Sequence, residues 1–399
     1  MTTENSEKNE DTKQERASAP VVSNKLKILI VIGDVGNGHR SGANAIKVGL
    51  EEVFGKDKVD IQIGDLFRDA DLPVFKHSEK SYNYFTEDPL RREFNNMLFN
   101  LTNTVAGFWF FATLGIIIAY DKAEEYLDKH QPDLIISVHP VISIAIGRYV
   151  ETHPQVKFAT VATDLVTMQR GWATRNADIV FCPTVQASSS LIDYGLRGTK
   201  IIPGLFPINP NFNKARSAKS VLEELKLETK GKYTVLLTGG GLATQSVVKH
   251  LDDLISDAEM QFIIIAGKQE DLKKELEVKY SSFNNVAILG YVNNMQDYIN
   301  AADLIIAKPG PATILEIEIM QKKCLLLSPV GEQEKGNINF ARLNPNFLYI
   351  EDMQTEDFLG ELKTLLKTET DFTPRHSAED VVKIAAKIKK LFEVRARQV

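Results

Sequence analysis

The sequence predicts an α/β protein made of two doubly wound, Rossmann-like domains that face each other across a cleft. The chain has 399 residues, more than one hydrophobic core usually serves, so two domains are expected. Short apolar runs recur along it, and each leads through a glycine-rich or polar turn into a helix-like segment, the pattern of a buried parallel sheet. A stretch rich in proline, glycine and asparagine at 204–211 separates these runs into two groups.

The chain divides into four expected parts. Residues 1–24 are polar and lack apolar periodicity, which is typical of a disordered tail. Residues 25–205 should form the N-terminal domain and residues 206–375 the C-terminal domain. Residues 376–399 have apolar side chains at helical spacing and predict a C-terminal amphipathic helix.

The composition is that of an ordinary globular protein, with 43% hydrophobic and 25% charged residues. The net charge of −6 argues against a nucleic-acid partner, since such proteins usually have a basic balance. Cys182 and Cys324 lie in apolar runs and read as reduced core residues, and the seven histidines show no metal-ligand spacing. The first twenty residues are polar rather than signal-like, so we expect a cytoplasmic protein.

The first apolar run, residues 27–32, leads through a glycine-rich turn into a helix expected to reach Leu50. His39 lies at the start of that helix. Glycines before it would let a substrate approach the backbone closely, and a neutral histidine there can accept a proton. The alternative is a surface histidine that only caps the turn.

Two further polar residues follow predicted strands of the same domain. His139 ends the run at 132–138, and Asp164 ends the run at 158–163. Because ligands gather outside the carboxyl ends of parallel strands, His39, His139 and Asp164 should meet at one crevice. The alternative for His139 and Asp164 is a hydrogen-bonding role that anchors their loops.

The C-terminal domain contains a buried run at 302–307 followed by a Gly/Pro turn and a helix start. A helix start accepts phosphate, and Glu316, one turn in, can accept hydrogen bonds from two neighbouring hydroxyls, as on a ribose. Gln333 and Glu334 follow the next strand and would extend the same crevice. Sites for a phosphate, a diol and further hydroxyls would then follow one another along the crevice, which indicates a nucleotide-sugar. The alternative is an ordinary strand-turn-helix without a ligand. Gly239, Gly240 and Gly241 form a second candidate phosphate cradle.

The pattern of Gly310, Thr313 and Glu316, followed by Gln333 and Asn337, resembles the carboxyl half of a glycosyltransferase family. That family contains the monogalactosyl- and glucosyl-diacylglycerol synthases and the transferase that adds N-acetylglucosamine to the lipid-linked peptidoglycan precursor. The Gly-x-Gly-His turn that ends at His39 resembles the family's amino end. The strings Val-His-Pro at 138–140 and Thr-Asp-Leu at 163–165 are more similar to the diacylglycerol branch. The resemblance covers about residues 25–345.

This resemblance implies a GT-B type enzyme in which the C-terminal domain binds a UDP-sugar and the N-terminal domain binds a lipid acceptor, most simply diacylglycerol. It implies that the backbone near Val292 reads the uracil ring, and that His39 takes the proton of the acceptor hydroxyl during an inverting hexosyl transfer. His139 and Asp164 are the other candidate catalytic residues. No metal or other cofactor is expected, since helix starts can stabilise the diphosphate.

The segment 105–119 is apolar and carries no charge, and Arg91 and Arg92 precede it. It is shorter than the roughly 20 apolar residues that a spanning helix needs. It predicts either a helix that dips into an anionic bilayer surface or lines a lipid-binding groove, or a helix buried against the sheet. The first alternative implies peripheral association with the inner face of the cell membrane.

Two other functions remain open at this point. A soluble UDP-sugar enzyme, either a 2-epimerase or a small-molecule glycosyltransferase, would have a similar two-domain plan. A non-catalytic relative that binds a UDP-sugar is the other, because Glu332 replaces a glycine usual in the family's loop.

Overall fold

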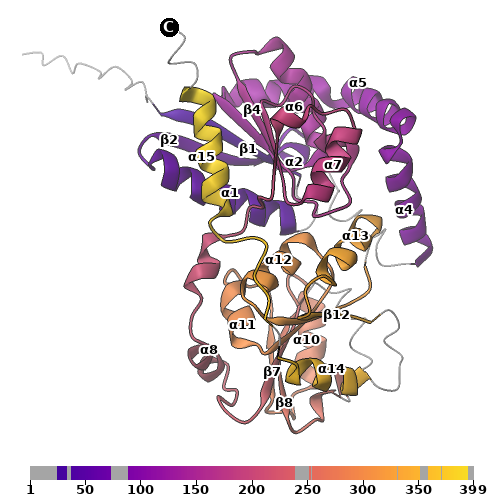
Figure 1. The fold of residues 1–399 in the computed structure, drawn as a ribbon, viewed down its shortest axis with the longest axis vertical. Coiled ribbons are helices and arrows are strands. Elements are labelled where there is room, and N and C mark those ends of the chain that lie inside the picture. Colours follow the sequence, from indigo (N-terminus) through magenta and orange to yellow (C-terminus); the bar gives the residue numbers. More distant parts are fainter. Residues whose placement is uncertain are drawn as a thin grey trace, which may run out of the picture.

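The computed structural model describes residues 25–33, 37–72, 89–238, 251–252, 254–329, 331–350, 358–369 and 371–393. It contains two six-stranded, all-parallel sheets with helices on their faces, stacked one above the other in Figure 1. The predicted fold class is therefore confirmed. The predicted tail at 1–24 and the glycines Gly239, Gly240 and Gly241 lie outside the described residues.

The N-terminal sheet has the strand order β2-β1-β3-β4-β5-β6. Its strands are β1 (Leu26–Ile32), β2 (Val59–Asp65), β3 (Leu134–Ser137), β4 (Lys157–Val161), β5 (Ile179–Cys182) and β6 (Ile201–Pro203). Its helices are α1 (Asn37–Phe54), α2 (Leu66–Asp69), α4 (Pro89–Asn103), α5 (Val105–His130), α6 (Pro140–Thr152) and α7 (Val185–Asp193). Helix α1 continues past the predicted end at Leu50, because Val53 and Phe54 still pack on the core.

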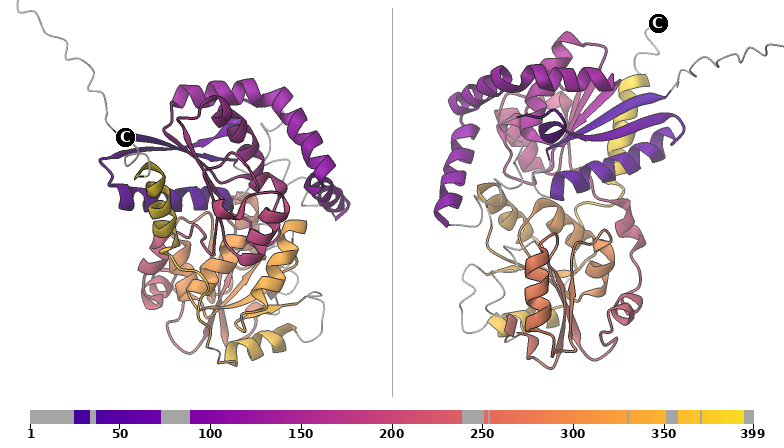
Figure 2. Two further views of the ribbon diagram at one scale, coloured as in Figure 1. Left: turned by 45° about the horizontal axis from the view of Figure 1, so that its top comes forward. Right: turned by 180° about the vertical axis from the view of Figure 1, so that it is seen from behind.

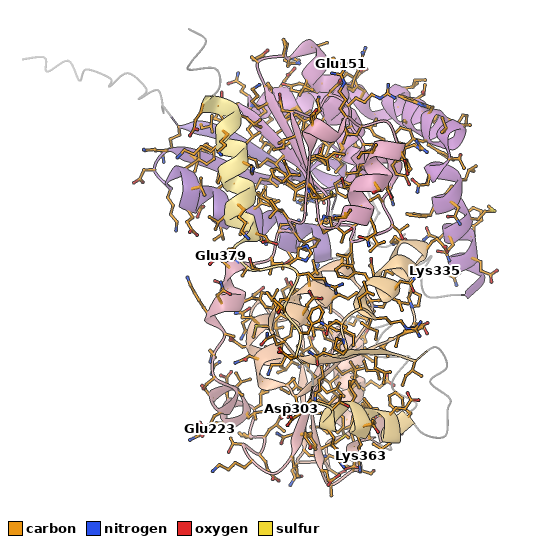
Figure 3. All side chains as sticks on the ribbon, viewed as in Figure 1. Glu151, Glu223, Asp303, Lys335, Lys363 and Glu379 are labelled. Atoms are coloured by element: carbon orange, nitrogen blue, oxygen red, sulfur yellow. The ribbon has the colours of Figure 1, made fainter. Side chains whose placement is uncertain are left out.

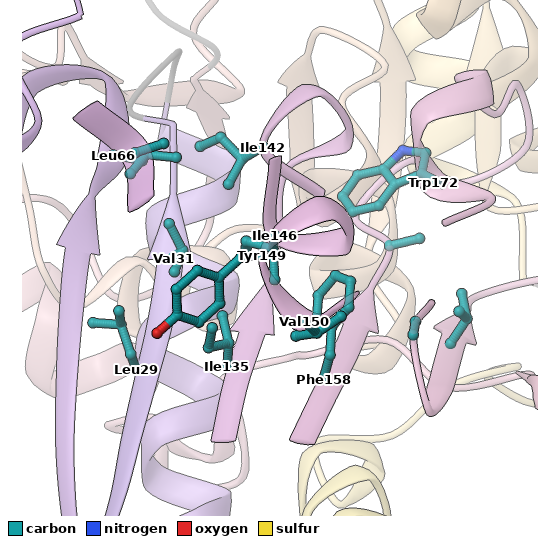
Figure 4. Packing of buried hydrophobic residues seen from close by; sticks show 14 of the residues in the cluster. Leu29, Val31, Leu66, Ile135, Ile142, Ile146, Tyr149, Val150, Phe158 and Trp172 are labelled. Atoms are coloured by element: carbon teal, nitrogen blue, oxygen red, sulfur yellow. The ribbon is translucent and has the colours of Figure 1, made fainter. Parts of the chain in front are cut away.

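Side chains alternate across this sheet and build two separate core layers. Leu29 and Val31 of β1 pack with the α5 and α6 side, whereas Ile28 and Ile30 pack with α1 and the C-terminal helix. Figure 4 shows the first layer, where Val31 lies with Ile142 and Ile146 of α6. Burial on both faces explains why these strands are continuous apolar runs in the sequence.

The C-terminal sheet repeats the plan with the order β12-β11-β10-β7-β8-β9. Its strands are β7 (Tyr233–Leu237), β8 (Met260–Ile265), β9 (Val286–Leu289), β10 (Leu304–Ala307), β11 (Lys323–Leu326) and β12 (Phe347–Tyr349). Its helices are α8 (Ala218–Glu224), α10 (Glu270–Lys279), α11 (Met295–Ala301), α12 (Pro311–Ile319), α13 (Glu332–Ala341) and α14 (Phe358–Lys367).

The last helix, α15 (Asp380–Glu393), leaves the C-terminal domain and packs on α1 of the N-terminal domain, as Figures 1 and 2 show. The approach is close enough that a Cβ at Gly49 would lie 2.7 Å from the Val381 carbonyl oxygen. The chain thus crosses between the domains twice.

Helices α4 and α5 form a bent pair along one side of the N-terminal domain, seen from two directions in Figure 2. Asn103 ends α4, and Thr104 caps α5 by accepting a hydrogen bond from Gly107 N. Among the described residues, no single helix is long and apolar enough to span a membrane. Segments Glu93–Asn103 and Val105–Gly115 reach that length and apolarity only as a pair, and the pair is bent by 94°.

Candidate functional site

A cavity of about 1050 Å³ lies between the two domains and receives residues from both. The carboxyl ends of β1, β3 and β4 meet it from the N-terminal side, and the loop after β10 meets it from the C-terminal side. Crevices of this kind are the usual ligand sites of open α/β sheets.

His39 and His139 lie together on the N-terminal wall, with ring centroids 4.9 Å apart. His39 Nδ1 is 2.9 Å from the Thr163 hydroxyl, which follows β4. In the tautomer in which Nδ1–H donates to Thr163, Nε2 is the basic nitrogen of the His39 ring. Gly33 is required behind this pair, since a Cβ there would lie 2.6 Å from the Phe67 ring and 3.0 Å from His139.

His139 is held by its own turn. Its extended backbone precedes Pro140 at the first position of α6, and Ser143 donates a hydrogen bond to its carbonyl oxygen. Burial lowers the pKa of the His139 ring well below its usual value, and charge on His39 would lower this pKa further. Within the described part of the chain, His139 Nδ1 has no hydrogen-bond partner. A neutral ring with an unsatisfied nitrogen suits a hydroxyl-bearing ligand.

Asp164 faces the cavity beside Thr163 and is anchored from behind. Trp172, which is fully buried, donates its indole N–H to Asp164 Oδ2 at 2.6 Å. Burial raises the pKa of Asp164 to about 6, although hydrogen bonds from Trp172 and the Gln169 backbone oppose the shift. The carboxyl group therefore titrates close to neutral pH.

The C-terminal wall is built by the turn after β10 and the start of α12. Gly310 and Thr313 line the cavity, and no side chain caps this helix. Its first turn therefore offers backbone N–H groups and a partial positive charge to an anion. Glu316 lines the same wall one turn further, where burial raises the pKa of its carboxyl group to about 8.

Gln333 and Glu334 reach the cavity from the first turn of α13. Glu334 is almost fully buried and pairs with Lys308 Nζ at 2.7 Å. Lys308 immediately follows β10 and also lines the cavity. The sequence reasoning missed this lysine, although its place at the carboxyl end of a strand is the signal that identified Asp164.

Asn337 is buried behind the cavity wall and is not among the residues that line it. Its side-chain Nδ2 donates to the Pro309 carbonyl oxygen at 2.9 Å, so Asn337 supports the turn that carries Gly310. Its contact with a ligand stays a prediction. Val292, in contrast, lines the cavity beside Tyr291.

The cavity also has cationic and apolar parts that the motifs did not indicate. Arg40, Arg170 and Lys268 line it, and Arg170 is held by Asn103 and stacks on the Tyr194 ring at 4.3 Å. Helices α5 and α6 supply a long apolar wall. The described residues contain no group of three or more His, Cys, Asp or Glu side chains placed to hold a metal ion.

Residues 105–119 are buried on one side of α5 and exposed on the other. Ala112 is buried on the inner side of α5, whereas Trp109 and Phe110 are 58% and 64% exposed on the outer side. Helix α4 adds Phe94, Met97 and Leu101 to the exposed apolar side chains. Near its middle α4 meets α13, close to Lys335 in Figure 3, and there Asn96 Oδ1 accepts a hydrogen bond from Glu332 N at 2.9 Å.

Comparison with known proteins gives two adjoining family matches. Residues 39–208 match the monogalactosyldiacylglycerol (MGDG) synthase family, and residues 234–344 match the glycosyltransferase family 28 C-terminal domain. The chain is 30% identical over 330 residues to a probable monogalactosyldiacylglycerol synthase of Glycine max, covering 79% of this chain and 61% of that protein. It is 29% identical over 330 residues to the Spinacia oleracea synthase, covering 79% and 62%. The chain thus spans about three fifths of the length of these relatives. These matches confirm the resemblance inferred from the motifs.

Solved structures at low identity support the fold alone. The S. aureus MnaA–UDP co-structure has a TM-score of 0.60 at 15% identity, covering 92% of this chain and 97% of that one. Acinetobacter baumannii MurG has a TM-score of 0.53 at 16% identity, covering 92% of this chain and 95% of that one.

Proposed function

Because the chain carries the paired domains of the monogalactosyldiacylglycerol synthases, we propose that it is an inverting glycosyltransferase that moves a hexose from a UDP-sugar to diacylglycerol. The observation that carries the proposal is the shape of the cavity. One continuous space joins a polar end, lined by His39, Asp164 and Glu316, to the apolar wall of α5 and α6. A sugar nucleotide and a lipid need these two environments side by side.

The donor is assigned to the C-terminal wall. Glu316 accepts hydrogen bonds from the ribose hydroxyls, and the start of α12 with Gly310 and Thr313 receives the diphosphate. Val292 lies against the base, while Gln333 and the Lys308–Glu334 pair face the sugar. Ligand binding would lower the pKa of Glu316 if the bound hydroxyls donate to its carboxylate.

The acceptor reacts at the N-terminal wall. The acceptor hydroxyl oxygen forms a bond to the anomeric carbon while the bond from that carbon to the UDP β-phosphate oxygen breaks, and UDP leaves. His39 Nε2 takes the hydroxyl proton, with the ring oriented by Thr163. His139 stays neutral beside His39, since burial disfavours its charged form. Asp164 orders the same wall through Trp172.

We further propose that the transfer needs no resident metal or other cofactor. Lys308, Lys268 and Arg40 line the cavity and can offset charge on the departing diphosphate together with the α12 start. Activity should therefore persist when a chelator such as EDTA is added, and a loss that Mg²⁺ restores would contradict this part of the proposal.

The protein is further proposed to act at the inner face of an anionic bilayer as a peripheral protein. The outer sides of α4 and α5 present a contiguous group of exposed apolar side chains, and such surfaces insert into the interfacial region of membranes. These side chains are Phe94, Met97, Leu101, Val105, Trp109, Phe110, Leu114, Ile117 and Ile118.

The test is a transfer assay with the purified chain. UDP-galactose, UDP-glucose or UDP-N-acetylglucosamine, radiolabelled in the sugar, is offered with diacylglycerol vesicles, and the lipid fraction is analysed for glycolipid. The relatives' names make galactose the expected hexose. A parallel incubation without acceptor monitors the sugar nucleotide for epimerisation. An epimerised sugar with no lipid product, or binding of UDP without any turnover, would overturn the proposal.

A further inference from the structure

Helix α5 has two apolar sides of different character. Its outer side exposes large side chains, whereas the side that lines the cavity carries small residues at helical spacing (Ala112, Gly115, Ala119 and Ala123) together with three aromatic ones. The cavity-lining residues of α5 are Phe108, Phe111, Ala112, Gly115, Ala119, Tyr120 and Ala123. Small residues on a helix that faces a cavity leave room next to the backbone.

The opposite wall of this part of the cavity is also apolar. Helix α6 contributes Val141, Ile142 and Ala145, and α4 contributes Leu98 and Phe99 beside the polar Asn95, Thr102 and Asn103. Of the described residues that α5 and α6 add to the cavity, none is charged. Tyr120 donates its hydroxyl to Glu124, and burial helps raise the pKa of Tyr120 to about 12, so that group stays neutral.

There is open space beside Gly115. A Cβ built on Gly115 would have no atom within 4 Å, although protein interiors are normally close-packed. From Phe108 to Ala123 the helix runs about 22 Å. One leaflet of a bilayer, and hence one acyl chain, is about half of the roughly 30 Å hydrocarbon core. The wall is therefore long enough for an extended acyl chain.

The space also begins where a lipid acceptor must react. His139 precedes α6, and its ring lies beside His39 at the polar end of the same cavity. We infer that the space between α5 and α6 binds an acyl chain of the acceptor, with Gly115 setting the room available for it. This inference rests on the proposed function and adds the location and the length discrimination of the acyl site.

The experiment compares Gly115→Leu with Thr113→Leu as its matched control. Thr113 lies on the same helix but is exposed and outside the cavity. Leucine favours a helix more than glycine does, so Gly115→Leu should not lower the melting temperature. Transfer to dipalmitoylglycerol should fall about tenfold or more, the effect of misfitting methylene groups in an apolar pocket. Transfer to dihexanoylglycerol, the affinity for UDP and vesicle sedimentation should match the wild type.

The outcomes separate the two proposals. Equal transfer by Gly115→Leu to the long- and short-chain acceptors would overturn the acyl site while leaving the enzyme assignment intact. A wild-type chain that glycosylates neither lipid contradicts the proposed function. The acyl site is then tested alone by binding of a fluorescent long-chain diacylglycerol. This probe should bind the wild type and Thr113→Leu, and bind Gly115→Leu at least several-fold more weakly. Equal binding by all three proteins would overturn the acyl site.

Discussion

Three titratable side chains in the cavity, His139, Asp164 and Glu316, are shifted toward their neutral forms. Burial is the largest cause of each shift: it lowers the pKa of His139 and raises those of Asp164 and Glu316. A site of neutral groups avoids the cost of buried charge before a ligand arrives. Because these pKa values differ between the folded and the unfolded chain, the stability of the protein depends on pH.

Glu316→Gln should change the pH dependence of stability. Burial raises the folded-state pKa of Glu316 from 4.5 to about 8, so the folded chain keeps a proton that the unfolded chain loses above pH 4.5. Stability is then lost as the pH rises from 4.5 to 8. Glutamine cannot ionise, so the variant should melt higher than the wild type at pH 8 and near it at pH 4.5. Each 1 kcal/mol corresponds to roughly 2–4 °C for a domain of about 150–250 residues.

Melting temperatures measured across this pH range check the prediction. Glu361→Gln is the control, because Glu361 is exposed on α14. If the melting curves of Glu316→Gln and the wild type change with pH in parallel, Glu316 is ionised in the folded chain and its assigned environment is wrong.

His39→Ala should lower kcat by roughly 10²–10⁴-fold, the usual contribution of a general base, and leave the affinity for UDP unchanged. The two effects separate because His39 and the α12 wall belong to different domains. Thr163→Val keeps the imidazole and removes only its partner at Nδ1, so it should lose less activity than His39→Ala. Steady-state kinetics measure kcat, and calorimetry measures the affinity for UDP. A fully active His39→Ala variant would mean that Asp164 or His139 is the general base.

Helices α4 and α5 contribute to three surfaces with different expected functions. Their outer sides are apolar and exposed, the inner side of α5 lines the cavity, and Asn96 of α4 holds the start of α13. Because α13 carries Gln333 and Glu334, one bent helix pair touches both the expected lipid surface and the sugar end of the cavity.

Replacing Trp109 and Phe110 together with Ser should abolish sedimentation with anionic vesicles and leave the fold and UDP binding intact. Both side chains are more than half exposed, so little packing is lost. Val278→Ser is the control, since Val278 is 77% exposed on α10 of the other domain. Unfolding of the double variant would show that these side chains are core residues, and unchanged sedimentation would place the membrane surface elsewhere.

Asn96→Ala should weaken donor binding. It removes the acceptor of the Glu332 backbone N–H and thereby loosens the turn that presents Gln333 and Glu334. The expected loss is about 0.5–1.5 kcal/mol, the net value of one hydrogen bond, measured by calorimetry with a UDP-sugar. Asn100→Ala, at an exposed position of the same helix, is the control. An unaltered affinity in Asn96→Ala would mean that α4 does not support the donor site.

The whole molecule is held together by the chain's second crossing between the domains. Arg375 donates to Glu318 through its backbone N–H and its guanidinium, and the guanidinium stacks on the Phe340 ring at 3.5 Å. His376 then contacts the Pro183 carbonyl oxygen of the N-terminal domain at 2.9 Å, before α15 packs on α1. The Arg375–Glu318 ion pair therefore holds the segment that leads into α15 in place.

Arg375→Met should lower the free energy of unfolding by about 3 kcal/mol, because the fully buried Glu318 loses its charge partner. Denaturant unfolding measures this loss. Arg148→Met is the control, since the Arg148–Glu151 pair is exposed and should leave the midpoint unchanged. If the two variants unfold alike, the Arg375–Glu318 pair does not stabilise the crossing.

Much of this protein followed from local sequence alone. Apolar runs bounded by glycine or polar turns are local signals, so the sheets, the helix starts and the placing of His39, His139 and Asp164 beyond strand ends were predictable. Because all strands of a parallel sheet present their carboxyl ends at one edge, those residues were also expected to meet.

Contacts between distant residues were decided only by the tertiary structure. The Lys308–Glu334 pair, the Trp172–Asp164 hydrogen bond and the withdrawal of Asn337 behind the wall depend on how separate elements pack. The same holds for residues 105–119 of α5, which are apolar on nearly every side, so no periodicity revealed which side lines the cavity and which meets solvent. A local pattern records whether a side chain prefers burial, whereas its partner is set by packing across the fold.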